Sequence, residues 1–296
     1  MTAENKYGKF SKDGLEYIIN TADTPRPWVN YLTNGQYAAL CSQTGGGFSF
    51  YKDHRFNQVL RRDMRQHLTD MPGRLIYIKD EETGEVWTAN VYPSGKFDSY
   101  EARQGLGYTT INSQYNSINS TVKYFVPREI DSEMWRVRID NKDSKPRKLS
   151  VYAFADFVLG NVMYEEGESR FMTLFNDSVI EEQSMLLIQK WWKTQFGPTE
   201  DDMIWEWIYR VFMVSTAKPS KMLTSRDDFL GKFRNYSNPE AVEADLLPDT
   251  LLSGRDLAGV FQWKIELQPG QAWETDLAIG IQGVEENAEN RKLIND

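Results

Sequence analysis

Hydrophobic and polar residues alternate along much of this 296-residue chain with the period of two that is typical of β-strands. The run Met134–Asp140 shows the pattern most clearly. Trp135, Val137 and Ile139 share one face of this predicted strand, and the charged residues between them share the other. One face is therefore expected to be buried and the other to meet solvent.

Turn signals separate the alternating runs. Asn34-Gly35 lies between the apolar runs 28–32 and 37–41, and Asn-Gly in that position is the strongest short-range indication of a β-hairpin. The run 100–111 also alternates and is interpreted as strand. No repeat of fixed length and no alternation of strands with helices is found, which argues against a parallel sheet. The pattern predicts an all-β chain forming a large antiparallel sandwich.

Helical structure is expected in one place only. The segment 285–296 is predicted to be helical, and the run 226–254 is predicted to be mostly irregular.

The stretch Gly45–Arg55 combines flexibility with aromatic and ionisable groups. Three consecutive glycines suit a sharp turn or a close approach of the backbone to a partner. Phe48 and Phe50 are expected to share one strand face, and three ionisable residues, Asp53 to Arg55, follow. The pattern alone favours a β-hairpin with a polar tip over part of a binding site.

Composition excludes several classes of protein. A net charge of -9 and a pI near 5.0 argue against nucleic acid as a partner. The single cysteine, Cys41, lies in an apolar run and is predicted to be a core residue. His54 and His67 do not have the spacing of a metal site. The polar start of the chain and the absence of a long apolar window predict a cytoplasmic protein with no membrane partner.

Aromatic residues make up 13% of the chain, which suits both thick β cores and surfaces that stack on sugars. Several motifs then occur in order: Tyr7-Gly8-Lys9-Phe10, Thr24-Pro25-Arg26-Pro27-Trp28, Gly46-Gly47-Phe48-Ser49-Phe50-Tyr51-Lys52-Asp53, Pro72-Gly73-Arg74-Leu75-Ile76-Tyr77, Glu101-Ala102-Arg103-Gln104-Gly105-Leu106-Gly107-Tyr108, Tyr124-Phe125-Val126-Pro127 and Arg226-Asp227-Asp228-Phe229-Leu230-Gly231. With these motifs the sequence resembles the N-terminal domain of the inverting disaccharide phosphorylases of glycoside hydrolase family 94, which include cellobiose, cellodextrin and chitobiose phosphorylases.

The resemblance implies a β-supersandwich of the galactose-mutarotase-like kind over residues 1–284 and the start of a helical linker at 285–296. In the family an (α/α)6 barrel follows and carries the general acid and the phosphate site, so no catalytic residue is assigned to this chain. Inorganic phosphate is the co-substrate of the complete enzyme, and one protein carboxyl group suffices because phosphate replaces the water and base of an inverting hydrolase. No cofactor and no metal is expected. The implied partners are a disaccharide or oligosaccharide, an (α/α)6 catalytic subunit on another chain, and further copies of the chain in a homo-oligomer.

The same resemblance implies that the domain supports dimerisation and lends side chains to the acceptor-sugar side of the active site. The candidate substrate-binding residues are Phe48, Tyr51, Asp53, Arg55, Glu101, Arg103 and Gln104. Charged planar groups and aromatic rings suit sugar hydroxyls and C–H faces, although a structural ion pair or core hydrogen bond explains each residue equally well. The family usually has His at the position of Gln104 and Tyr at that of Phe48, differences that would alter hydrogen bonding to the sugar.

Two alternatives remain open, as does the question of whether the chain is an enzyme by itself. A free-standing carbohydrate-binding module would need exposed aromatic residues, for which Trp191-Trp192 and Trp205 with Trp207 are the candidates. A self-sufficient supersandwich enzyme such as a mutarotase would need a His/Glu arrangement, and neither His54 nor His67 lies in a matching motif.

Overall fold

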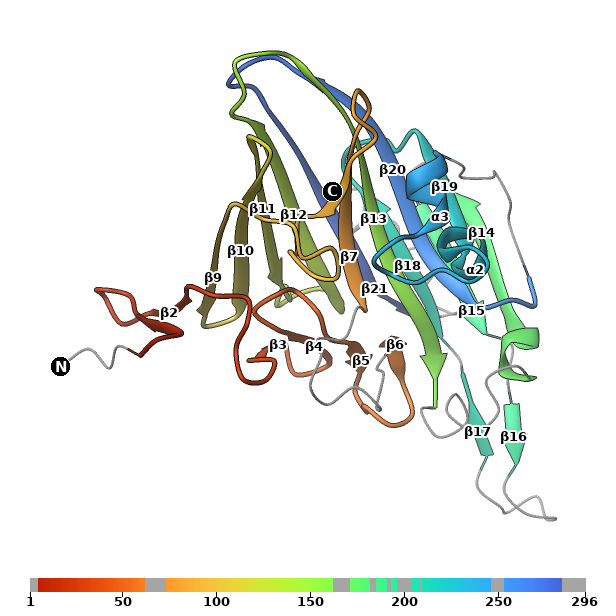
Figure 1. Cartoon of the computed structure of the whole chain (residues 1–296). Coiled ribbons are helices and arrows are strands. Elements are labelled where there is room, and N and C mark those ends of the chain that lie inside the picture. Colours follow the sequence, from red (N-terminus) through yellow and green to blue (C-terminus); the bar gives the residue numbers. More distant parts are fainter. Residues whose placement is uncertain are drawn as a thin grey trace.

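A computed structural model describes residues 5–61, 73–161, 171–181, 185–190, 193–195, 204–207, 209–245 and 253–283. Within these residues every strand pair is antiparallel. Two large sheets stand face to face in Figure 1, with two short helices against one of them.

The first sheet has ten strands. In spatial order they are β1 (Gly8–Phe10), β2 (Glu16–Ile19), β9 (Ser99–Gly105), β10 (Tyr108–Tyr115), β11 (Ile118–Phe125), β12 (Ser132–Asn141), β21 (Ala272–Gly283), β18 (Tyr209–Ser215), β15 (Met185–Lys190) and β14 (Asn176–Glu181).

The second sheet has nine strands, and β13 is its central member. The main path is β19 (Lys221–Ser225), β20 (Leu257–Leu267), β13 (Arg147–Gly160), β6 (Gln58–Leu60), β5 (Ser49–Tyr51), β4 (Tyr37–Cys41) and β3 (Asn30–Thr33), while β7 (Arg74–Asp80) pairs with β13 and β8 (Val86–Thr88) pairs with β7. A separate pair consists of β16 (Lys193–Gln195) and β17 (Ile204–Glu206), and Thr173–Phe175 forms a 3-10 turn.

The main core lies between the two sheets. In β11 and β12 alternate residues are buried, and Trp135, Val137 and Ile139 are at most 1% exposed. β13 is buried on both faces because the helices α2 (Arg226–Leu230) and α3 (Glu240–Ala244) cover its outer side. Phe229 of α2 stacks on Phe154 of β13 with ring centroids 4.7 Å apart.

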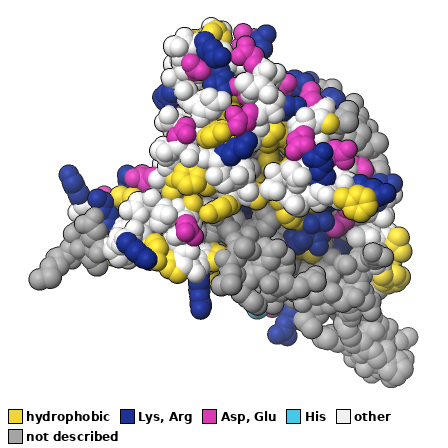
Figure 2. Space-filling model, viewed as in Figure 1, with side chains coloured by type: hydrophobic (Ala, Val, Ile, Leu, Met, Phe, Trp, Pro, Cys, Tyr) yellow, Lys and Arg dark blue, Asp and Glu magenta, His cyan; other side chains and the backbone are white. Residues whose placement is uncertain are grey.

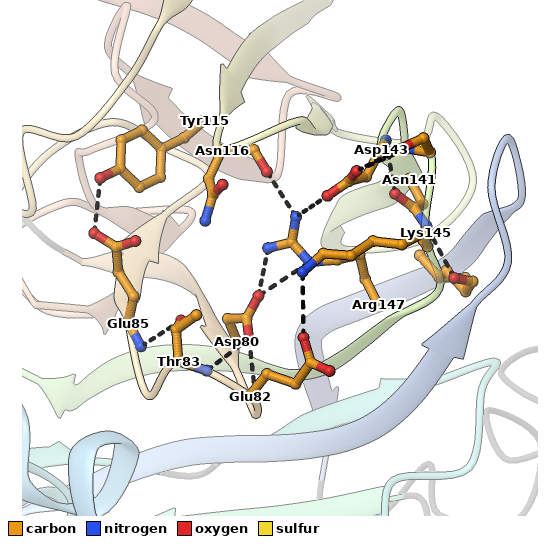
Figure 3. A network of polar contacts seen from close by, with 12 residues as sticks. Asp80, Glu82, Thr83, Glu85, Tyr115, Asn116, Asn141, Asp143, Lys145 and Arg147 are labelled. Atoms are coloured by element: carbon orange, nitrogen blue, oxygen red, sulfur yellow. Dashed lines mark hydrogen bonds and ion pairs between the residues drawn. The ribbon is translucent and has the colours of Figure 1, made fainter.

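The turns at the end of the sandwich opposite β3–β6 are tied together by one buried arginine (Figures 1 and 3). Arg147 donates to both Asp80 and Asp143, and to the backbone carbonyl of Asn116. Asp80 in turn accepts the backbone N–H groups of Glu82 and Thr83. This network fixes hairpin ends and carries none of the predicted site residues.

Most of the fold predictions are confirmed. The sandwich is antiparallel, Asn34-Gly35 joins β3 to β4, and Cys41 is a core residue. One prediction is wrong. The expectation of helix at 285–296 alone fails, because the run 226–254, otherwise irregular in its described residues as predicted, contains two helices that are too short for helical periodicity to show. The run 100–111 is strand as predicted, and Leu106-Gly107 divides it by turning β9 into β10. The predicted linker at 285–296 lies outside the described residues.

Candidate functional site

The triple glycine packs onto the core, where a side chain would not fit. Gly45 and Gly47 have φ values of +80° and +130°. A Cβ atom on Gly47 would lie 2.1 Å from the carbonyl oxygen of Leu40, and one on Gly45 would lie 2.1 Å from the amide nitrogen of Asn90. These positions therefore need glycine because the backbone packs closely against its neighbours inside the fold.

The glycine segment closes over a buried arginine–carboxylate pair. Arg74 and Glu133 are 1% and 2% exposed, and Arg74 donates from Nε and Nη2 to the two carboxylate oxygens at 3.1 and 2.8 Å. Arg74 also donates to the carbonyl of Leu40 at 2.8 Å, and Trp135 Nε1 donates to Glu133. Burial lowers the pKa of Arg74, but the neighbouring groups, Glu133 first, together outweigh it and the net pKa is raised. The Arg74 guanidinium stays charged, and the pair is fully enclosed.

β5 separates the predicted aromatic residues onto two faces. Phe48 and Phe50 stack with centroids 6.0 Å apart, as their spacing predicts. Tyr51 points to the inner face, where it packs edge-on against Tyr209 of β18 at 5.1 Å, and burial raises its pKa. Phe48 is buried and Tyr51 nearly so, at 4% and 9% exposure. Neither ring presents an open face to a ligand.

The end of β5 forms a tight polar turn. Asp53 Oδ1 accepts the backbone N–H groups of Arg55 and Phe56 at 2.7 and 3.0 Å. The ring of His54 lies edge-on to Phe50 with centroids 6.0 Å apart, and Arg55 is exposed. Asp53 therefore has a local structural role, which leaves Arg55 as the predicted residue of this segment that is open to solvent.

The outer face of β9 carries a half-exposed charged group that we call the β9 cluster: Glu16, Glu101, Arg103 and Tyr108. Arg103 donates to Glu101 at 2.7 Å and to Glu16 at 2.9 Å, and the Tyr108 hydroxyl donates to Glu16 at 2.6 Å. The hydrogen bond from Tyr108, and to a lesser degree those from Arg103, lower the pKa of Glu16. The hydrogen bonds to Glu101 and Glu16 raise the pKa of Arg103. The side chains of Arg103 and Glu101 are 37% and 39% exposed. A planar guanidinium beside two carboxyl groups can bind vicinal hydroxyl groups.

Gln104 does not belong to that surface, because alternate residues of β9 point to opposite faces. Its amide Nε2 donates to the backbone carbonyl of Trp28 at 2.7 Å. The backbone N–H of Trp28 donates to Gln43, whose own carbonyl accepts the hydroxyl of Tyr100 at 2.6 Å. Gln104 thus helps to connect β9 with the segment that leads into β3.

The predicted site residues fall into two groups on different sheets. Phe48 to Arg55 belong to β5 and its turn in the nine-stranded sheet, whereas Glu101 to Gln104 belong to β9 in the ten-stranded sheet. The contacts described for the first group go to β4, β6 and β18, and those for the second go to β2, β10 and Trp28. The structure brings Glu101 and Arg103 together but does not join them to the β5 group.

A third polar group was missed by the sequence-based prediction. Asp156 of β13 is 2% exposed and accepts hydrogen bonds from Arg61, Arg226 and the hydroxyl of Tyr236. Asp256 pairs with the same two arginines at 2.6 and 3.5 Å. Burial raises the pKa of both carboxyl groups, but in Asp156 the two arginines outweigh it and the net pKa is lowered, whereas that of Asp256 is raised.

This group fixes α2 to the sheet. Arg226 opens α2, and Tyr236 follows it, so the motif that begins at Arg226 attaches the helix to β13. The described residues contain no cluster of three or more His, Cys, Asp or Glu side chains that could hold a metal ion, and no helix that is long and apolar enough to cross a membrane.

Of the tryptophans proposed for an exposed binding row, Trp207 is buried at 4% exposure. Trp191 and Trp192 lie outside the described residues.

Comparison with known proteins decides the family. The model of the glycosyl hydrolase 94 supersandwich domain matches residues 15–296. The chain belongs to this family. As a family 94 supersandwich, it is 30% identical to an N,N'-diacetylchitobiose phosphorylase of Vibrio furnissii over 280 residues, which cover 93% of this chain and 33% of that protein. It is 29% identical to a solabiose phosphorylase of Paenibacillus borealis over 268 residues, covering 90% and 33% of the two chains. The chain thus spans about one third of the length of these curated relatives.

Among solved structures, a bacterial glucoamylase complexed with acarbose matches with a TM-score of 0.51. The match covers 93% of this chain and 37% of the glucoamylase at 9% identity, so it shows a shared fold alone.

Proposed function

We propose that this chain is the supersandwich part of an inverting disaccharide phosphorylase, and that it works with an (α/α)6 barrel that supplies the general acid and the phosphate site. The observation that carries the proposal is the family match over residues 15–296, together with relatives that phosphorolyse N,N'-diacetylchitobiose and solabiose by name. The chain would not be catalytic alone. Its proposed tasks are to support a homodimer and to bind the acceptor sugar.

The geometry supports the β9 cluster as the acceptor-binding part. Glu101 and Arg103 are the predicted site residues that are both half-exposed and held rigidly, each by a hydrogen bond or ion pair on one strand face. Side chains that are already held in place lose little entropy when they bind hydroxyl groups. Arg55 is proposed as a further contact because it is exposed at the end of β5. Phe48, Tyr51, Asp53 and Gln104 are proposed to shape the surface from within, because each is already engaged in the fold.

In the proposed reaction the acid of the barrel protonates the glycosidic oxygen while phosphate attacks the opposite face of the sugar. The acceptor sugar is then the leaving group, and Arg103 with its two carboxylates would hold its hydroxyls. Holding the leaving group in place lowers the entropy cost of the step.

An assay of sugar phosphate release tests the proposal. The purified 296-residue chain with inorganic phosphate and either cellobiose or N,N'-diacetylchitobiose is expected to show no turnover. Addition of an (α/α)6 barrel polypeptide encoded beside the chain is expected to restore inverting phosphorolysis. Turnover by the chain alone, or a chain that never associates with such a polypeptide, would refute the proposal.

A further inference from the structure

The Asn34-Gly35 pair that joins β3 to β4 combines a structural role with chemical reactivity, and it is the one Asn-Gly pair in the sequence. A backbone nitrogen can attack the side-chain amide of a preceding asparagine, and glycine obstructs the attack least because it has no side chain. Gly35 is exposed, and a Cβ atom built on it would meet no heavy atom within 4 Å beyond the neighbouring residues. Water, which the reaction consumes, therefore reaches this turn.

Backbone N–H groups already hold the oxygen on which negative charge would develop. Asn34 Oδ1 accepts the N–H groups of Gln36 and Tyr37 at 3.0 and 2.8 Å. Donors in this arrangement stabilise the oxyanion that forms when a nucleophile adds to a carbonyl carbon. The N–H of Gly35, whose nitrogen would be the nucleophile, donates to Thr33 Oγ1 at 3.0 Å. The folded turn thus holds in place both the oxygen that would gain charge and the nitrogen that would attack.

The amide of Asn34 also links the two sheets, at the end of the sandwich that holds β3–β6 in Figure 1. Its Nδ2 donates to the carbonyl of Ile130 at 3.2 Å and to Asp131 Oδ1 at 3.0 Å. Ile130 and Asp131 directly precede β12, and the carbonyl of Asp131 accepts the N–H of Ile281 in β21 at 3.0 Å. An ionised aspartate at position 34 would have no hydrogen to donate here and would face a second carboxylate.

We propose that Asn34 is a site of spontaneous deamidation and that the reaction weakens this link between the sheets. The Gly35 nitrogen loses its proton to water and forms a bond to Asn34 Cγ. The Cγ–Nδ2 bond then breaks, and Nδ2 takes up a proton and leaves as ammonia. Water opens the resulting succinimide ring and yields aspartate or isoaspartate. Water is consumed and ammonia is released in equal amounts, no group is oxidised or reduced, and the turn gains a negative charge beside Asp131.

The isoaspartate product also changes the backbone of the turn, because the chain then runs through one additional carbon atom. The register of a hairpin depends on the geometry of its turn, so the pairing of β3 with β4 is disturbed. The end of β5 is attached to the same turn, since the N–H of Lys52 donates to the carbonyl of Gln36 at 2.7 Å. Deamidation therefore affects both the contact between the sheets and the support of β5.

Peptide mapping by mass spectrometry of the folded 296-residue chain, aged at mildly alkaline pH, tests the reaction. We expect Asn34 to convert to aspartate and isoaspartate about tenfold faster than Asn116, or more. Asn116 is the internal control, because it is exposed in the turn between β10 and β11 but is followed by Ser117. A rate no higher than that of Asn116, or conversion of Asn34 only after unfolding in urea, refutes the proposal.

Urea unfolding of variants tests the structural consequence. Asn34→Asp reproduces the aspartate product and is expected to lower the urea midpoint. Addition of Asp131→Asn to that variant is expected to restore most of the loss, because it removes the facing carboxylate, and Asp131→Asn alone completes the double-mutant cycle.

Gln36→Glu is the matched control for the added charge. Gln36 is exposed in the same turn, and both hydrogen bonds described for it are made by its backbone. Figure 2 shows acidic and basic side chains interspersed over the surface that it draws, so a further exposed carboxylate should leave the midpoint unchanged. Equal midpoints in Asn34→Asp and Gln36→Glu, or a loss that Asp131→Asn does not reduce, would refute the proposed weakening of the link.

Discussion

The pair Arg74–Glu133 and the group of Arg103 with Glu101 and Glu16 are made of the same residue types in different surroundings. The first is enclosed between the sheets at 1% and 2% exposure, and the glycine segment closes over it. In the second, Arg103 is 37% exposed on the outer face of β9. A buried pair that loses one member leaves an uncompensated charge, whereas a surface pair contributes little to stability. Exposure, rather than residue type, therefore separates what holds the fold from what is free to bind a ligand.

The largest effect is expected from Glu133→Ala, which leaves Arg74 buried without its counter-charge. The free energy of unfolding should fall by about 3–5 kcal/mol, measured by urea denaturation. Glu274→Ala is the matched control, since Glu274 is 55% exposed and pairs with Arg138 on the outer face of the same sheet. If Glu133→Ala lowers the free energy of unfolding by less than about 1 kcal/mol, the buried pair is no more important for stability than the exposed group, and the comparison fails.

Asp156→Asn probes an intermediate case, because the carboxylate is buried but Arg61 and Arg226 are 22% and 23% exposed. We expect a loss of about 2–3 kcal/mol at pH 7, between the two extremes. The folded pKa of Asp156 is lowered, so its contribution is present above the ordinary carboxyl pKa of about 4 and is lost as pH falls through the folded value.

Urea denaturation at pH 7 and at lower pH measures this effect. The difference between wild type and Asp156→Asn should shrink as pH falls below about 4. A difference that grows in acid would contradict the lowered pKa. Asp256, whose pKa is raised, has the opposite sign and loses stability as pH rises towards its folded value.

Gln104→Ala is expected to cost about 1 kcal/mol of unfolding free energy, because the carbonyl of Trp28 loses its donor. Since Gln104 points away from the β9 cluster, acceptor preference in the assembled phosphorylase should not change. Acceptor KM values measured for glucose and N-acetylglucosamine in the synthetic direction check this. A changed ratio of the KM values for the two sugars would show that Gln104 contacts the acceptor.

The smallest effect on stability is expected from Arg103→Ala, at less than about 1 kcal/mol, because its ion pairs are solvated. Thermal or urea unfolding of Arg103→Ala and Glu133→Ala under identical conditions measures this loss of stability. Similar losses in the two variants would show that the β9 cluster is as structural as the core pair.

The sequence predicted the sandwich because period-two alternation depends on neighbouring residues only, as in Trp135, Val137 and Ile139. It could not place Arg74 beside Glu133, or Asp156 beside Asp256, since these contacts join residues far apart along the chain. The start of α2 did carry a local signal, because Ser225 accepts the backbone N–H of Asp228 at 3.1 Å as an N-cap.

The candidate site was predicted less completely than the fold. Residue types and family motifs pointed to Glu101 and Arg103, and the structure leaves both half-exposed. The same reasoning gave equal weight to Tyr51 and Gln104, whose side chains face the interior. Which face a side chain takes depends on strand register, and register follows from pairing across the whole sheet.

The most direct test of the acceptor assignment compares Arg103→Ala with Arg138→Ala in the assembled phosphorylase. Arg138 is a close match, 44% exposed on the outer face of the same sheet and paired with Asp140 and Glu274. We predict that the KM for the acceptor sugar rises about tenfold or more in Arg103→Ala, with kcat little changed, and stays at the wild-type value in Arg138→Ala. Equal KM values in the two variants would contradict the assignment of the β9 cluster to the acceptor.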